Sequence, residues 1–113
     1  MAKIEIVKSL FEDIKKKFNG KSHKIIDLME NLEQNPNKGK LLGNIAGILI
    51  KEIRYNSFRF YFITNGYKLK FVNASGLNDI LIRFIRISDK KNQQKIINEI
   101  KKVLANIWFD AFN

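Results

Sequence analysis

The hydrophobic residues of this chain change their spacing at Ile48, and this change constrains the fold more than any other feature. Before it, apolar residues recur at helical spacing, as in Ile25, Met29 and Leu32. From Ile48 onward they recur at every second position, which is the period of a strand with one buried face. The sequence therefore predicts helices first and a sheet second, an α+β arrangement.

The first part of the chain is expected to form a strand over residues 3–8 and then two helices. Ser9 and Glu12 have the spacing of a capping box for the first helix, and Gly20 is placed to end it. Ser22 is a candidate N-cap for the second helix, and Pro36 lies just beyond its end. Two helices with so short a connection are predicted to pack as a helical hairpin.

Residues 38–47 contain three glycines and are predicted to be a loop. Gly39 and Lys40 superficially suggest a phosphate-binding loop. The upstream glycine and the following Ser or Thr of a Walker motif are missing, however, so that interpretation is set aside.

Four strands are expected after this loop, over residues 48–54, 58–64, 67–72 and 80–87. Asn65-Gly66 is typical of a two-residue hairpin turn, and it predicts that Phe62 pairs with Leu69. The fourth strand is almost continuously apolar, so we expect it at the centre of the sheet. A last helix is expected after Ser88 or Asp89, and it would close one domain of residues 1–113 over a small antiparallel sheet.

The turn over residues 55–58 predicts that Arg54 lies opposite Arg59 and Glu52 opposite Tyr61. These four side chains would then share an outward, solvent-facing surface of the sheet. Two arginines directly opposite each other repel, so either an anion binds between them or Glu52, diagonal to both, neutralises them. We favour the anion, because a tyrosine and lysines are expected in the same patch. The other candidate contacts to nucleic acid are Lys68, Lys70, Lys91 and Arg86.

Charge is the outlier in the composition. The net charge is +10, with nine basic and six acidic residues in positions 1–50 but twelve and five in positions 51–113. A field of this size attracts a polyanion, of which RNA is the leading candidate; a basic surface that serves solubility is the alternative. Cysteine is absent and His23 is the one histidine, so neither a transition-metal site nor a cofactor is expected. No apolar run approaches the ~20 residues of a membrane span, and the first residues do not resemble a signal peptide, so we expect a cytoplasmic protein without a membrane partner.

Two segments resemble the RelE/ParE superfamily of toxins from toxin–antitoxin systems. Residues 47–62, GILIKEIRYNSFRFYF, are similar to that family's central hairpin, in which E-x-R is followed by a short turn and Y/F-R. Residues 84–97, FIRISDKKNQQKII, are similar to the end of its last strand and the start of the following helix. The NP-x-x-G segment of residues 35–39 also agrees.

This resemblance implies a RelE-like fold and a toxin held by an acidic antitoxin protein. One branch of the family cleaves mRNA on the ribosome without a metal, and another inhibits DNA gyrase and cleaves no RNA. For the ribonuclease branch, the resemblance implies that Arg59 contacts the scissile phosphate, that Arg54 assists it, and that Lys90 and Lys91 supply basic groups after the last strand. This chain has Ile50 and Glu52 where the best-studied ribonuclease members have lysines.

Three functions follow as hypotheses: an mRNA endoribonuclease, a non-enzymatic toxin of gyrase, and a basic nucleic-acid-binding module. For the first, Arg54 and Arg59 would stabilise charge on the phosphorane, and Glu52, Lys70 or Lys90 would take the proton of the ribose 2′-OH. Tyr61 would stack on a base or donate a hydrogen bond. Arg59→Ala is expected to remove activity and leave the fold intact, because the side chain is predicted to face solvent.

Overall fold

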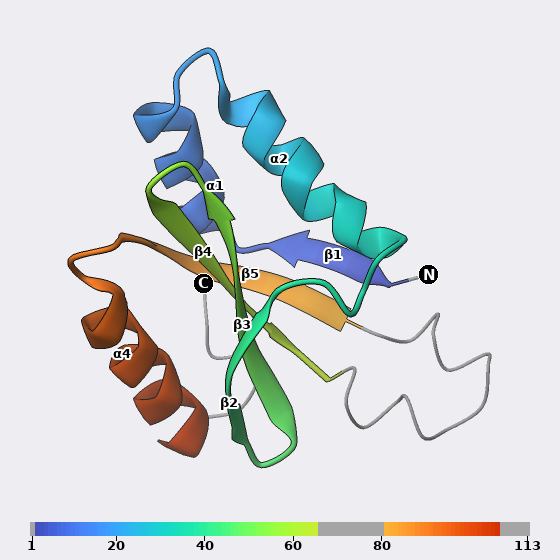
Figure 1. Ribbon diagram of the computed structural model, residues 1–113, viewed down its shortest axis with the longest axis vertical. Helices are drawn as coiled ribbons and strands as arrows, with labels where there is room; N and C mark the ends of the chain where they lie inside the picture. The colour runs from blue at the N-terminus through green and yellow to red at the C-terminus, as the bar shows by residue number, and fades with distance from the viewer. Residues whose placement is uncertain (1, 66–80, 107–113) are drawn as a thin grey trace.

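The computed structural model describes residues 2–65 and 81–106, and these form an α+β fold as predicted (Figure 1). A first strand leads into two helices and a short 3-10 helix, four strands follow, and a helix lies last. In chain order the elements are β1 (Lys3–Ile6), α1 (Lys8–Lys17), α2 (Ser22–Glu30), η1 (Asn31–Glu33), β2 (Lys40–Ile45), β3 (Ile48–Tyr55), β4 (Phe58–Thr64), β5 (Leu81–Asp89) and α4 (Gln93–Asn106).

The strands form one sheet in the order β1-β5-β4-β3-β2. The pairs β2–β3, β3–β4 and β4–β5 are antiparallel, whereas β1 pairs parallel to β5, so the sheet is mixed. Strand β5 lies between β1 and β4, in the interior position that its continuous apolar run predicted.

The β3–β4 hairpin has the register predicted from the sequence. Arg54 pairs with Arg59 and Glu52 pairs with Tyr61. Asn56 adopts a φ of 55° in the turn, in the left-handed region that Asn tolerates better than most residues. The turn thus fixes which side chains share each face of the sheet.

The prediction of a loop over residues 38–47 is wrong, because most of this segment is β2, paired with β3. Ala46 and Gly47 form a tight turn with φ values of 54° and 86°, and Asn44 Oδ1 accepts a hydrogen bond from the Gly47 N–H at 2.9 Å. A register shift between Leu41 and Gly43 interrupts the alternation of the strand. This bulge hid the strand from a test based on period two.

The predicted partner of β4 is also wrong. Residues 67–72 lie outside the described residues, but β4 is flanked by β3 and β5, and Phe62 pairs with Phe84 instead of Leu69. Asn65 directly follows the end of β4, and its Oδ1 accepts a hydrogen bond from the Leu81 N–H, at the start of β5, at 3.0 Å.

Both predicted helix caps are wrong by one or two residues. Helix α1 has Val7 as its N-cap and α2 has Lys21, and neither cap residue makes a side-chain hydrogen bond to its helix. Val7 N–H donates to Phe84 O at 3.0 Å, so the chain passes from the sheet directly into α1 and leaves no room for Ser9 to precede it. Gly20, with a φ of 84°, follows α1 as expected.

The sheet has two covered faces. Helices α1 and α2 cover one, which we call the hairpin face (Figure 1). On this face Phe18 packs edge-on against Tyr55 and Phe58 at centroid distances of 6.1 and 5.1 Å. Helix α4 packs against the other side, which we call the arginine face because it carries Glu52, Arg54, Arg59 and Tyr61. Buried apolar side chains from both layers form the core.

Candidate nucleic-acid interface

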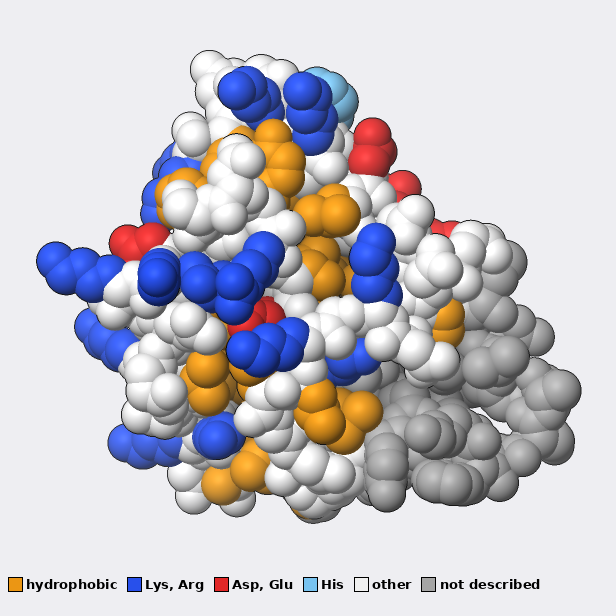
Figure 2. Space-filling model, in the orientation of Figure 1, with side chains coloured by type: hydrophobic (Ala, Val, Ile, Leu, Met, Phe, Trp, Pro, Cys, Tyr) orange, Lys and Arg blue, Asp and Glu red, His pale blue; other side chains and the backbone are white. Residues whose placement is uncertain are grey.

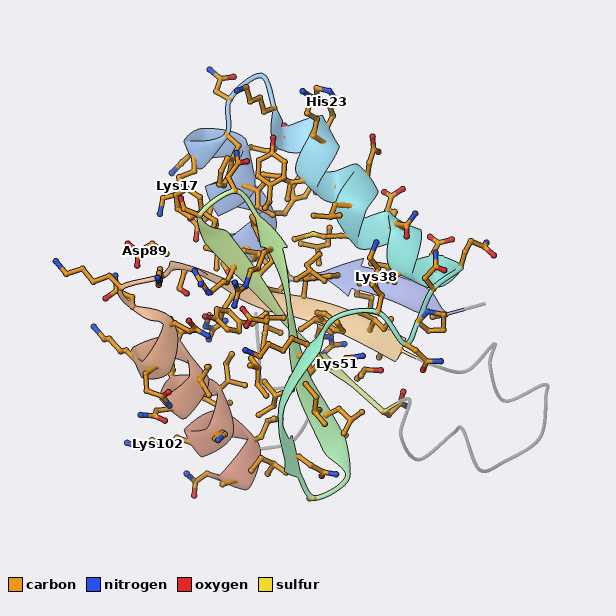
Figure 3. All side chains as sticks on the ribbon, in the orientation of Figure 1. Lys17, His23, Lys38, Lys51, Asp89 and Lys102 are labelled. Atoms are coloured by element: carbon orange, nitrogen blue, oxygen red, sulfur yellow. The ribbon has the colours of Figure 1, made fainter. Side chains whose placement is uncertain are left out.

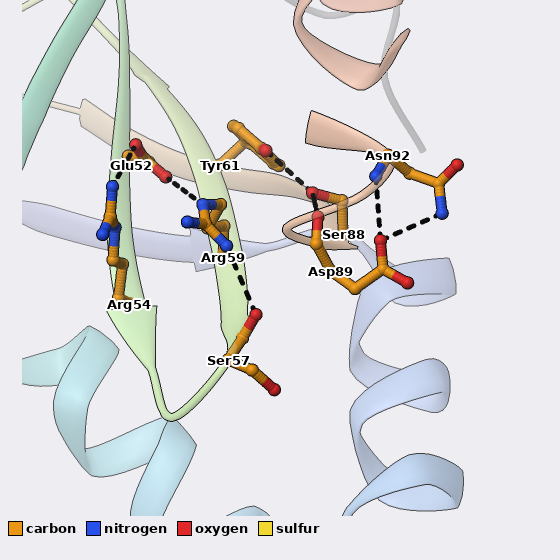
Figure 4. Close-up of polar contacts among 8 residues, drawn as sticks. All are labelled: Glu52, Arg54, Ser57, Arg59, Tyr61, Ser88, Asp89 and Asn92. Atoms are coloured by element: carbon orange, nitrogen blue, oxygen red, sulfur yellow. Dashed lines mark hydrogen bonds and ion pairs between the residues drawn. The ribbon is translucent and has the colours of Figure 1, made fainter. Parts of the chain in front are cut away.

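Arg54 and Arg59 converge on Glu52, as Figure 4 shows. The Arg59 Nε lies 3.6 Å from Glu52 Oε2, and the Arg54 Nη2 lies 3.8 Å from Glu52 Oε1. The sequence left open whether an outside anion or Glu52 compensates the two arginines, and the geometry shows that Glu52 pairs with both of them. Two cations around one carboxylate still leave one uncompensated positive charge in the cluster.

The members of this cluster differ sharply in exposure. The side chain of Glu52 is 1% exposed and that of Arg59 is 7% exposed, whereas that of Arg54 is 53% exposed. The prediction that all of them face solvent is wrong for Glu52, Arg59 and Tyr61. Strands β3 and β4 are interior strands of the sheet, and α4 packs on the arginine face. Side chains that point away from the hairpin face are therefore still covered.

Tyr61 is fully buried, and its hydroxyl is engaged by a neighbouring strand. The Tyr61 Oη and the Ser88 Oγ are 2.8 Å apart, and Ser88 Oγ donates to Asp89 O at 3.0 Å (Figure 4). Burial raises the pKa of the Tyr61 phenol, which therefore stays neutral at physiological pH. A buried ring cannot stack on a base, so the predicted contact of Tyr61 with nucleic acid is not supported by its position.

Lys90 and Lys91 are exposed in the turn between β5 and α4. This turn is held by Asp89, whose Oδ1 accepts hydrogen bonds from the Asn92 N–H and the Asn92 side chain, both at 2.9 Å. The Asn92 N–H bond is the main reason why the pKa of Asp89 lies below its usual range. Because Ser88 pairs with Arg59, the turn is at the same end of the sheet as the arginine cluster.

The remaining predicted contacts fall in different places. Arg86 pairs with Tyr61 across the strands, and its Nε donates to Glu99 Oε1 at 2.9 Å, so it ties β5 to α4. Lys68 and Lys70 lie outside the described residues.

Lys40 is a basic residue of this surface that the sequence analysis missed. It pairs with Glu52 in the β2–β3 register, so it belongs to the row that Glu52 and Tyr61 continue, and it is exposed. The loop prediction for residues 38–47 removed it from consideration. The signal that could have found it is the short turn at Ala46-Gly47 between two isoleucines, which is typical of a hairpin.

Figure 2 shows Lys and Arg side chains gathered across the middle of one face, with an acidic group between them. Guanidinium groups bind phosphate well because their donors match two phosphate oxygens at once. Within residues 2–65 and 81–106, no three His, Cys, Asp or Glu side chains are grouped so that they could hold a metal ion. No helix in those same ranges has the length and apolarity to cross a bilayer.

Comparison with known proteins adds no identity: no family model, curated protein or solved structure matches this chain.

Proposed function

We propose that this chain is the toxin of a toxin–antitoxin pair and acts as a metal-independent, ribosome-associated mRNA endoribonuclease. One observation carries the proposal: Arg54 and Arg59, paired directly across the β3–β4 hairpin, surround a single carboxylate and leave a net positive charge on a sheet face. Directly opposed arginines repel each other, and Glu52 compensates one of the two charges, so the cluster can still take an anion. The pair also matches the E-x-R and Y/F-R elements of RelE/ParE toxins.

The proposed reaction is attack of a ribose 2′-OH on the adjacent phosphate. The new O2′–P bond gives a 2′,3′-cyclic phosphate, the P–O5′ bond breaks, and the leaving O5′ takes a proton. Arginine charge would stabilise the phosphorane, a preorganised electrostatic effect. Lys90, exposed at the same end of the sheet as the arginine cluster, is the candidate for the base, whereas Glu52, the other predicted candidate, has both carboxylate oxygens buried and is held by the two arginines. The ribosome would position the substrate.

Burial of the cluster favours a second candidate, a non-enzymatic toxin that inhibits DNA gyrase. Glu52 and Arg59 are buried against each other, and Tyr61 is bonded to Ser88, so three of the predicted site residues have partners within the fold. A surface of this kind can hold a partner through its exposed cations without cutting RNA. A basic nucleic-acid-binding module is the third candidate. An acidic antitoxin would be the partner of either toxin.

RNA-end mapping after induced expression tests the proposal. We expect cuts within translated mRNA. We expect Arg54→Ala to remove them, because it takes away a cation that would stabilise the phosphorane. The variant should still fold, because Arg54 is half exposed and lies outside the core. Lys24→Ala is the matched control, since Lys24 is an exposed cation on α2. Intact transcripts with inhibited supercoiling would favour the gyrase toxin, whereas neither effect, together with RNA binding in vitro, would favour the simple binding module.

A further inference from the structure

The two arginines of the cluster are held in different ways. Arg59 is buried, its Nη1 donates to Ser57 O at 3.3 Å, and its Nε lies 3.6 Å from Glu52. Arg54 has a half-exposed side chain that contacts Glu52 through a 3.8 Å ion pair. Arg59 is therefore anchored in the fold, and Arg54 is free to turn toward solvent.

The carboxylate of Glu52 is buried with unused capacity to accept hydrogen bonds. Neither of its two buried carboxylate oxygens has a hydrogen-bond partner among residues 2–65 and 81–106, and the same holds for the Arg59 Nε. Both ion pairs exceed the 2.7–2.9 Å or so of a charge-assisted hydrogen bond, so charge rather than directed bonding holds Arg54 over Glu52. A phosphate can offer Arg54 two hydrogen bonds that Glu52 does not make in this arrangement.

We infer that Arg54 is the arginine that takes a phosphate of a bound RNA, and that Glu52 competes with that phosphate for it. Arg59 has a positioning role: it keeps the charge of Glu52 compensated when Arg54 turns away. This assignment rests on the proposed RNA function, and it reverses the roles that the family resemblance implies for the two arginines. Glu52 thus sets the affinity of the site.

Fluorescence anisotropy with a short single-stranded RNA tests the inference on the full chain. Glu52→Gln keeps the side-chain shape and removes the competing charge, so we expect binding to tighten roughly three- to tenfold at low salt. Glu30→Gln changes the net charge equally at an exposed position of α2, and we expect less than about a twofold change there. Arg54→Ala should weaken binding and cancel the gain from Glu52→Gln in the double variant.

Side-chain NMR of the unsubstituted protein gives a second test that does not depend on the folding of Glu52→Gln. On titration with the same RNA, the Arg54 Nε–Hε signal should shift more than that of Arg59. RNA binding with equal effects of Glu52→Gln and Glu30→Gln, or a larger shift at Arg59, would overturn the inference and leave the proposed function standing. Failure of the unsubstituted protein to bind RNA would overturn the proposed function first, and the inference with it.

Discussion

Both faces of the sheet are covered, but they differ in the kinds of side chain that they bury. The hairpin face is aromatic: Phe18 packs on Tyr55, Phe58 and Phe60, and Phe62 lies 4.9 Å from Phe84 between ring centroids. The arginine face buries a carboxylate, a guanidinium and a phenol. Buried charges are costly to desolvate, and within the described residues the arginine face buries two, Glu52 and Arg59, whereas the hairpin face buries one, Lys51.

Each face has a different weakness. On the hairpin face, stability depends on how closely rings and backbone fit, because dispersion contacts are lost over short distances. On the arginine face, stability depends on keeping each buried charge compensated, because an isolated charge cannot be solvated there. Substitutions on the two faces should therefore fail for different physical reasons.

Arg59→Ala should have the largest effect. It leaves the buried carboxylate of Glu52 with Arg54 alone, and breaking a buried ion pair from one side costs about 3–5 kcal/mol of unfolding free energy. Urea denaturation measures this loss. The expectation from sequence that this variant keeps its fold intact assumed a solvent-facing Arg59, and the side chain is buried, so a loss of stability is now expected instead.

Arg54→Ala is the matched control for that prediction. Because Arg54 is half exposed, its removal should cost less than about 1 kcal/mol. Equal losses for the two variants would contradict the division into an anchored and a free arginine.

Gly39→Ala probes the hairpin face and should cost about 3 kcal/mol, from backbone strain and overpacking together. Gly39 has a φ of 108°, and a Cβ there would lie 2.9 Å from Phe62 Cζ and 3.2 Å from the carbonyl oxygen of Glu52. Gly20→Ala, at a φ of 84° with no atom within 4 Å, should cost only the backbone strain of about 1 kcal/mol. Thermal unfolding of both variants distinguishes close fit from backbone strain, and equal losses would argue against tight packing at Phe62.

The sequence could predict interactions that are local in the chain, but not those that are non-local. The register of the β3–β4 hairpin follows from a local turn, so the convergence of Glu52, Arg54 and Arg59 was predictable. The neighbour of β4 is a non-local choice between competing strands, and Asn65-Gly66 favoured the wrong one. Burial of the arginine face depends on strands at both sides and on α4, none of which is encoded in the period of residues 48–64.

Tyr61→Phe tests the arginine face without touching its charges. The hydroxyl lost is bonded to Ser88 Oγ at 2.8 Å, while Ser88 keeps its bond to Asp89 O, so we expect a loss of about 1 kcal/mol in unfolding free energy. Tyr55→Phe is the control on the hairpin face. Its ring packs on Phe18, and its hydroxyl makes no hydrogen bond within the described part of the chain, so the change should be smaller. A larger loss at Tyr55 would mean that the polar network of the arginine face does not stabilise the fold.

Lys51→Met should change the free energy of unfolding at neutral pH by less than about 1 kcal/mol, the smallest of these effects. It tests the one buried charge that the described residues place on the hairpin face. The Lys51 Nζ donates to Asn37 O at 3.0 Å and lies 5.9 Å from the centre of the Phe62 ring (Figure 3). Burial lowers the pKa of Lys51 below its usual 10.5, so in alkaline solution the unfolded chain binds more protons than the folded one. The free energy of unfolding should therefore gain a contribution from Lys51 as pH rises through its folded-state pKa toward 10.5.

Lys51→Met should remove that contribution, which denaturant titrations from neutral pH to about pH 10 would detect as a difference in slope between the two proteins. Lys24→Met, at an exposed position of α2, is the control and should leave the slope unchanged. Parallel pH profiles for all three proteins would mean that Lys51 is as well solvated as a surface lysine. Water would then reach the hairpin face despite its aromatic packing, and the two faces would differ only in the arginine cluster.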